Sequence, residues 1–247
     1  MTQLSAILRP VLIFFSASGE RVMTDVALKL LKAALLIGAV AWLFRQVRNP
    51  SGLLGKRVIR AMNLGHAKMT DWALDQVPIP KDAAALDIGC GGGRTVQRLA
   101  VLAPNGKIVG LDNSPTSVAA SQETNANEIL AGRVRIEQGS VASMPFPDRT
   151  FHIVTAAETH YYWPDLPANV REVFRVLKPG GTFLLIAETY KGGPFRFLYG
   201  IVMFLLGAAF LTDAEHRDLL LHAGFTDVVT KHVAGKNWIC AIGRRPA

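Results

Sequence analysis

The stretch ALDIGCGGGRT, residues 85–95, decides the fold of this 247-residue chain. A short apolar run leads through Asp87 into four glycines, and a helical pattern follows them. In a sheet of parallel strands, ligands bind at the carboxyl ends of the strands, beside turns of this kind. The glycines therefore predict that a ligand approaches the bare backbone between the first strand and the first helix.

Beyond residue 81, short β-rich runs alternate with helical stretches, which is typical of a parallel sheet covered on both faces. The last two strands are joined so closely that they must run antiparallel. We expect an α/β protein with a Rossmann-like, seven-stranded, mostly parallel sheet, a C-terminal antiparallel hairpin, helices on both faces and additional N-terminal helices. The predicted strands are 84–88, 107–112, 133–139, 150–157, 182–189, 225–233 and 236–245. The predicted helices of this part are 95–103, 114–131, 169–177 and 213–223.

Three segments are expected along the chain. An apolar, basic segment occupies residues 1–48, and two short helices form a cap at 49–80 after the helix breakers Pro50 and Gly52. The α/β domain then covers 81–247, with an apolar lid insertion at 192–211.

The basic charge of the chain lies mainly in its first 80 residues, which carry ten Lys and Arg but four Asp and Glu. Because this part is aliphatic and has few aromatic residues to stack on bases, it suits an anionic membrane surface better than a nucleic acid. Its apolar run 26–44 is interrupted by Lys29 and Lys32, so a helix packed on its own domain, an interfacial helix and a tilted membrane crossing all remain open. The candidates for peripheral membrane contact are 26–44 and 195–211.

The cysteines point to a reducing compartment. Cys90 and Cys240 are the only two, they lie far apart in the sequence, and nothing resembles a secretory cleavage site. We therefore expect a cytoplasmic protein that is a candidate for membrane association. No Cys/His spacing predicts a metal site.

The glycine turn does not fit two common nucleotide-binding motifs. A dinucleotide fingerprint requires a third glycine, but its two frames place Arg94 or Val96 there. A phosphate-binding P-loop requires Gly-Lys before Ser or Thr, which this turn lacks. The expected ligand is a nucleoside without a diphosphate.

Residues 87–93, DIGCGGG, resemble the first motif of the class I S-adenosylmethionine-dependent methyltransferases. The segments 110–115, 139–159 and 171–185 resemble the next three family landmarks in the correct order. The likeness is greatest to the small-molecule branch that includes ubiquinone and menaquinone C-methyltransferases. It implies S-adenosyl-L-methionine as cofactor, with Asp112 holding both ribose hydroxyls. The cofactor-binding residues that it implies are Asp87, Gly89, Cys90, Gly91, Gly93, Asp112, Asn113, Ser140, Val141 and Ala157.

One position departs from the family pattern. Relatives often carry an aspartate that contacts the adenine amino group, and this chain has Ser140 there. The backbone N–H of Val141 and the Ser140 hydroxyl are the groups left to hold the purine.

The fourth strand leads into AAETHYYWPD, residues 156–165, at the place where the family faces the transferred methyl group. Glu158 and His160 are the candidate catalytic residues, because they can orient an acceptor and take a proton. Three aromatic residues and a histidine are candidates for substrate binding, since aromatic faces attract cations. These are Tyr161, Tyr162, Trp163 and His66. Packing of the aromatic residues at a strand-to-helix corner is the alternative.

The apolar lid and basic N-terminal segment favour a small acceptor that is apolar or held at a membrane. The predicted function is methyl transfer from S-adenosylmethionine to such an acceptor, with an unknown oligomeric state. Two alternatives remain: a non-catalytic cofactor-binding module of a membrane-associated complex, and an RNA or protein methyltransferase.

Overall fold

A computed structural model describes residues 28–32, 34–36, 38–39, 42, 45–46 and 48–247. The chain divides into two compact units, Met1–Arg45 and Gln46–Ala247. The described residues of the first unit are helical and exposed. Among all described residues, no helix is both long enough and apolar enough to cross a membrane. The rest of the 26–44 run lies outside the described residues.

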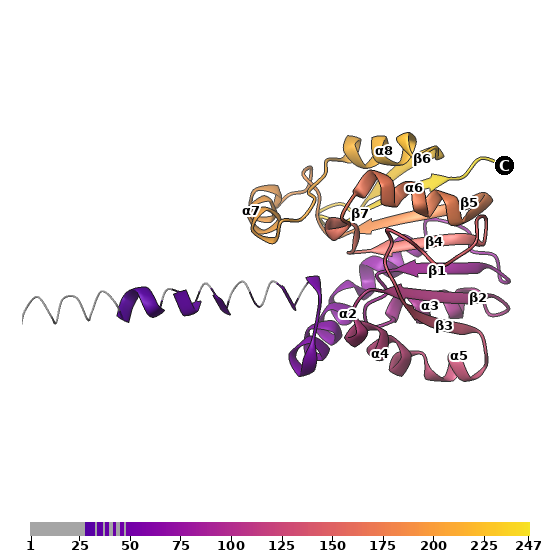
Figure 1. The fold of residues 1–247 in the computed structure, drawn as a ribbon. Helices are drawn as coiled ribbons and strands as arrows, with labels where there is room; N and C mark the ends of the chain where they lie inside the picture. The colour runs from indigo at the N-terminus through magenta and orange to yellow at the C-terminus, as the bar shows by residue number, and fades with distance from the viewer. Residues whose placement is uncertain (1–27, 33, 37, 40–41, 43–44, 47) are drawn as a thin grey trace, which may run out of the picture. The chain divides into compact units, whose positions relative to one another are not determined.

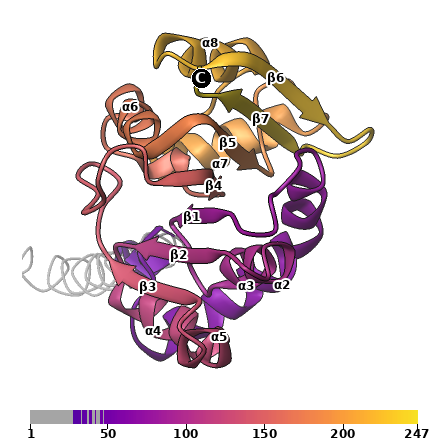
Figure 2. The same ribbon diagram turned by 90° about the vertical axis from the view of Figure 1, so that its right-hand side faces the viewer.

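The second unit is built on one seven-stranded sheet (Figure 1). The strands are β1 Ala84–Ile88, β2 Lys107–Asp112, β3 Val134–Gln138, β4 Phe151–Ala157, β5 Leu177–Ala187, β6 Thr226–His232 and β7 Ile239–Arg244. Their order is β3-β2-β1-β4-β5-β7-β6, which Figure 2 shows as a stack from β3 to β6. Among strands β1 to β5, every pair of neighbours in the sheet is parallel, while β7 is antiparallel to both β5 and β6. The predicted fold is therefore confirmed, including its C-terminal hairpin.

Eight helical elements belong to this unit. They are α2 Gly52–Leu74, α3 Arg94–Leu102, α4 Pro115–Thr124, α5 Ala126–Leu130, the 3-10 helix η1 His160–Tyr162, α6 Leu166–Val176, α7 Arg196–Leu206 and α8 Asp213–His222. Apolar side chains of α6 and α8 pack on one face of the sheet, and those of α2, α3 and α4 pack on the other. The sheet is thus covered on both faces, and the loops at one end of its strands are left to form a site.

Two predicted helix boundaries were wrong. The two short helices expected at 49–80 are one helix, α2, because Gly65 adopts helical geometry on an exposed turn without ending it. The single helix expected at 114–131 is broken at Asn125. The buried Asn125 side chain donates hydrogen bonds to the carbonyls of Gly93 and Ser121, at 3.1 and 2.9 Å, so a contact with the glycine turn interrupts the helix.

Candidate functional site

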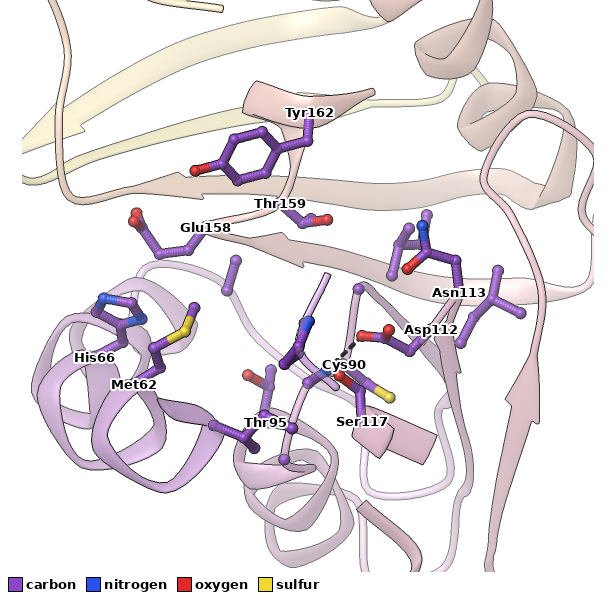
Figure 3. Close-up of a pocket in the computed structure, with 18 of the residues that line it drawn as sticks. Met62, His66, Cys90, Thr95, Asp112, Asn113, Ser117, Glu158, Thr159 and Tyr162 are labelled. Carbon is purple, nitrogen blue, oxygen red and sulfur yellow. Dashed lines mark hydrogen bonds between the residues drawn. The ribbon is translucent and has the colours of Figure 1, made fainter. Parts of the chain in front are cut away.

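A pocket opens at the carboxyl ends of β1, β2 and β4 and is bordered by α2 (Figure 3). The turn Gly89–Gly92 and the carboxyl end of β2 form one part, which we call the glycine end. His66 of α2, Glu158 and Tyr162 form the other part, which we call the carboxylate end. The pocket therefore lies where parallel α/β sheets bind their ligands.

Asp112 is the last residue of β2 and the charged group of the glycine end. One carboxylate oxygen accepts a hydrogen bond from the backbone N–H of Gly91, and the other accepts one from Ser114, both at 2.9 Å. Burial raises the pKa of Asp112, although these backbone hydrogen bonds oppose the rise. The carboxylate is held in a fixed orientation beside the glycine turn.

The four glycines of the turn have different reasons to lack a side chain. A Cβ on Gly89 would lie 2.2 Å from the hydroxyl of Thr159, and one on Gly92 would lie 2.2 Å from the amide of Asn63 in α2. At Gly91, with φ of 52°, the nearest atom would be 4.0 Å away. Close packing of α2 and of the loop after β4 explains most of the glycines, and Gly91 alone leaves bare backbone beside open space.

Gly93 completes the turn as the N-cap of α3. Its φ of 80° is left-handed, and a Cβ there would lie 2.4 Å from the Asn125 amide and 2.9 Å from the Ser121 backbone. This glycine lets α4 and α5 pack against the turn, and it does not line the pocket.

Glu158 follows β4 and dominates the carboxylate end. Its φ of 59° is unusual for a non-glycine residue. One carboxylate oxygen accepts hydrogen bonds from the Tyr161 hydroxyl, at 3.1 Å, and from the backbone N–H of Glu188. Burial raises the pKa of Glu158 to about 7, against the opposing effects of His66 and of these donors. A carboxyl group with such a pKa can gain or lose a proton near neutral pH.

His66 approaches Glu158 from α2, as Figure 3 shows. Its Nε2 lies 3.2 Å from a carboxylate oxygen of Glu188, which follows β5. One imidazole nitrogen of His66 and one carboxylate oxygen each of Glu158 and Glu188 all lie within 4.8 Å of one another. Burial lowers the pKa of His66, but the hydrogen bond to Glu188 and the two carboxylate charges outweigh burial and raise it overall.

Most of the site residues predicted from the sequence line this one pocket. They are His66, Gly89, Cys90, Gly91, Asp112, Asn113, Ser140, Val141, Ala157, Glu158, Tyr162 and Trp163. Four predicted residues do not line it: Asp87, Gly93, His160 and Tyr161.

His160 was expected to act in catalysis, but the structure does not place it in the pocket. Its side chain is 1% exposed and packs against the rings of Tyr161 and His216, with centroids 4.2 and 5.5 Å away. The turn of η1 directs it into the interior, where burial and the neighbouring His216 lower its pKa well below the usual range. It has no access to the pocket.

Asp87 and Tyr161 contact other residues of the protein and do not line the pocket. Asp87 is buried and accepts a hydrogen bond from the Thr155 hydroxyl at 2.7 Å, so it braces β1 against β4. Tyr161 is also buried, does not line the pocket, and donates a hydrogen bond from its hydroxyl to Glu158 at 3.1 Å. The predicted contacts of these two residues with ligands are corrected to contacts within the protein.

Several pocket residues were missed in the sequence. Met62, Asn63 and Thr70 enter from α2, and none of them was predicted to line a site. Glu188 is not a lining residue, but it contacts His66. The parallel pairing of Ala157 with Ile186 could have indicated it, because residues after two neighbouring parallel strands meet at one edge.

The glycine end is suited to a nucleoside. Its carboxylate can accept hydrogen bonds from a vicinal diol, and the open backbone at Gly91 leaves room for close approach. The apolar Leu111 and Val141 and the hydroxyl of Ser140 line the same part of the pocket. The residues present therefore fit an adenosine group that carries no diphosphate.

Comparisons with known proteins agree with this geometry. Residues 85–181 match the family model described as a methyltransferase domain. A chain in the complex between the Haloferax volcanii Trm112 methyltransferase activator and a methyltransferase has the same fold, with a TM-score of 0.71, 20% identity, and coverage of 78% of this chain and 95% of that one. Human N-acetylserotonin methyltransferase in complex with SAM gives a TM-score of 0.65 at 20% identity, with coverage of 78% and 56%. These findings confirm the resemblance to the class I S-adenosylmethionine-dependent methyltransferases and the cofactor that this resemblance implies.

The names of the curated relatives describe enzymes that methylate small molecules. A 2-methyl-6-phytyl-1,4-hydroquinone methyltransferase of Oryza sativa is 28% identical over 74% of this chain and 54% of its own length. A demethylmenaquinone methyltransferase of Symbiobacterium thermophilum is 33% identical over 41% of both chains. A sterol 24-C-methyltransferase of Neurospora crassa is 31% identical over 59% of this chain and 34% of its own. The matches thus span about a third to a half of these relatives.

Proposed function

We propose that the chain binds S-adenosylmethionine in the glycine end of the pocket and transfers its methyl group to a small, apolar acceptor at the carboxylate end. The observation that carries this proposal is the Asp112 carboxylate, fixed by two backbone N–H groups beside the open backbone of Gly91. When bound, the cofactor supplies a methyl group attached to a sulfonium.

Each residue of the glycine end has a proposed task. Asp112 holds the ribose hydroxyls, since a charged acceptor makes strong hydrogen bonds to O–H donors. Ser140, Val141 and Asn113 border the base, and Cys90, Gly89 and Gly91 present backbone to the rest of the nucleoside. Burial raises the pKa of the Cys90 thiol well above its usual range, so it stays a neutral, small group.

The carboxylate end is proposed to orient the acceptor. Tyr162 and Trp163 supply aromatic walls, and Arg48 lies 5.8 Å from the Tyr162 ring centroid. Glu158 offers a carboxylate oxygen to an acceptor O–H or N–H. The main contributions to the rate are alignment of the two reactants and exclusion of water.

The names of the relatives suggest acceptors for the test. Purified protein would be incubated with methyl-labelled S-adenosylmethionine and, separately, with reduced demethylmenaquinone, 2-methyl-6-phytyl-1,4-hydroquinone and a sterol. We expect label in the organic extract with at least one acceptor, and none with Asp112→Ala. Cofactor binding without transfer to any acceptor, including a metabolite extract, would favour the non-catalytic module. Salt-sensitive RNA binding would instead favour an RNA methyltransferase.

We also propose that α7 contacts a membrane from which an apolar acceptor is taken. Phe197 and Phe204 are 79% and 83% exposed, and Leu198, Ile201 and Leu205 are each about 60% exposed on the same helix. This helix does not line the pocket, so the lid role expected of 192–211 is not seen in this structure. Co-sedimentation with anionic vesicles should fall for the double variant Phe197→Ser and Phe204→Ser, with unchanged cofactor binding. Equal sedimentation of the double variant and the unmodified protein would contradict the proposed membrane contact.

A further inference from the structure

The backbone conformation and the hydrogen bonds of Glu158 indicate a role beyond connecting β4 to the next helix. Its backbone is left-handed, a strained conformation for a non-glycine residue that structures retain where the position is needed. Arg149 and Asp227, which also have positive φ, lie outside the pocket. Tyr161 and the Glu188 backbone both donate to the same oxygen of Glu158, and among the described residues its other oxygen accepts no hydrogen bond.

A charged pair stands beside this carboxyl group. His66 comes from α2 and Glu188 from the end of β5, and they contact each other at 3.2 Å. The side chain of His66 is 24% exposed and that of Glu188 is 40% exposed, whereas Glu158 is strongly desolvated. The pair therefore lies between the partly buried carboxyl group of Glu158 and solvent.

We propose that Glu158 takes the proton that the acceptor loses, and that His66 and Glu188 are positioning residues that keep Glu158 ionised and pass this proton to water. The inference rests on the proposed function and adds its proton acceptor. The acceptor's bond to hydrogen breaks and its electron pair stays on the acceptor for the new bond to the methyl carbon, while the methyl–sulfur bond breaks and sulfur keeps that electron pair. The proton joins the free oxygen of Glu158, which becomes neutral. His66 first releases its own proton to solvent and then, as a neutral imidazole, accepts the proton of Glu158, so that both groups return to their starting states.

The signs of the charges support this division of tasks. Burial raises the pKa of Glu158, and the positive charge of His66 opposes that effect. The hydrogen bond from His66 lowers the pKa of Glu188 despite partial burial, so Glu188 stays ionised and helps to keep His66 protonated. The other groups facing Glu158 are the hydroxyls of Tyr161 and Tyr162, whose pKa values burial raises, so both stay neutral.

The pairing is tested without any acceptor. The imidazoles of isotopically labelled full-length protein are titrated by NMR, with His66→Gln to assign the His66 signal. We expect His66 to titrate above its ordinary value, and to fall by about one pH unit in Glu188→Gln, because an opposite charge within hydrogen-bond reach is lost. His66 titrating at its ordinary value in both proteins would overturn the pairing.

The proton transfer is tested by the pH dependence of kcat/KM with an acceptor that takes label. Glu158→Gln should lower kcat/KM by roughly 10²–10⁴-fold at high pH, where Glu158 is ionised, and should remove the acidic limb. His66→Gln should move the acidic limb upward by about one pH unit, leaving the rate at high pH nearly unchanged. His222→Gln, on the exposed surface of α8, is the matched control and should leave the limb in place. An unmoved limb in His66→Gln would contradict the proposal.

Two further readouts separate this inference from its alternatives. Calorimetry with S-adenosylhomocysteine should give affinities within about twofold for all of these variants, and failure of the unmodified protein to bind would remove the proposed function instead. Titration with Zn²⁺ or Mn²⁺ should give no binding that depends on His66. Binding that Glu158→Gln and His66→Gln both abolish would assign the cluster to a metal ion and overturn the proton route.

Discussion

The two ends of the pocket are built in different ways. At the glycine end, the turn 89–92 and Asp112 come from two adjacent strand ends, and backbone N–H groups hold the carboxylate. At the carboxylate end, His66, Glu158 and Glu188 come from a helix and two strand ends that are distant in sequence. A compact motif fixes the first end, whereas tertiary packing assembles the second.

This difference predicts that the two ends respond independently to substitutions. Main-chain geometry leaves little freedom at the glycine end. At the carboxylate end, α2 places His66 beside Glu158, so a substitution of His66 should alter this end and leave the glycine end intact. The predictions below test this independence.

The largest effect is expected for Asp112→Ala. Loss of two charge-assisted hydrogen bonds should weaken S-adenosylhomocysteine binding by about 100-fold or more, as measured by calorimetry. Asp218→Ala, on the exposed face of α8, is the control and should bind normally. Unchanged affinity in Asp112→Ala, with unaltered thermal unfolding, would remove the ribose assignment.

Gly93→Ala should be strongly destabilising. A left-handed alanine costs about 1–2 kcal/mol, and overlap with the Ser121 backbone adds roughly 1–3 kcal/mol, so the free energy of unfolding should fall by several kcal/mol. Urea denaturation measures this. A loss below 1 kcal/mol would show that α4 moves away from the turn at little cost.

Burial raises the pKa of both Asp87 and Glu158 to about 7. Asp87 lies in the interior, whereas Glu158 lines the pocket. A carboxyl group whose folded pKa is raised holds extra protons between about pH 4 and 7, so the free energy of unfolding falls as pH rises through that range. Asp87→Asn should remove part of this fall, roughly 1 kcal/mol or more between pH 5 and 8. The same slope in Asp87→Asn as in the unmodified protein would contradict the shift.

Gly65→Ala is expected to have the smallest effect and the opposite sign. Gly65 lies in the interior of α2, is exposed, and has open space where a Cβ would be. Alanine should raise the free energy of unfolding by about 0.5–1 kcal/mol, because it is the better helix former. Destabilisation would indicate that α2 bends at this glycine.

The sequence allowed a good prediction where local signals agree with the packing. Ser114 caps α4 as expected, with Pro115 at the first helical position, and α8 starts with a capping box at Thr212. The break at Asn125 depends on hydrogen bonds to a distant turn, which no local pattern reveals. Local periodicity also could not show that α2 continues through Gly65.

The candidate site was predictable to a similar degree. The motif around the glycines and Asp112 located one end of the pocket. His160 illustrates the limit at the other end, because the direction of a single 3-10 turn buries it while Tyr162, two residues later, faces the pocket. Glu188 required knowledge of which strands are neighbours.

A crystal structure of the protein with S-adenosylhomocysteine tests the central claim most directly. The ribose hydroxyls should lie within hydrogen-bond distance of the Asp112 carboxylate, with the sulfur directed toward the carboxylate end of the pocket. A nucleoside bound elsewhere, or bound without contact to the Gly91 backbone, would contradict the account.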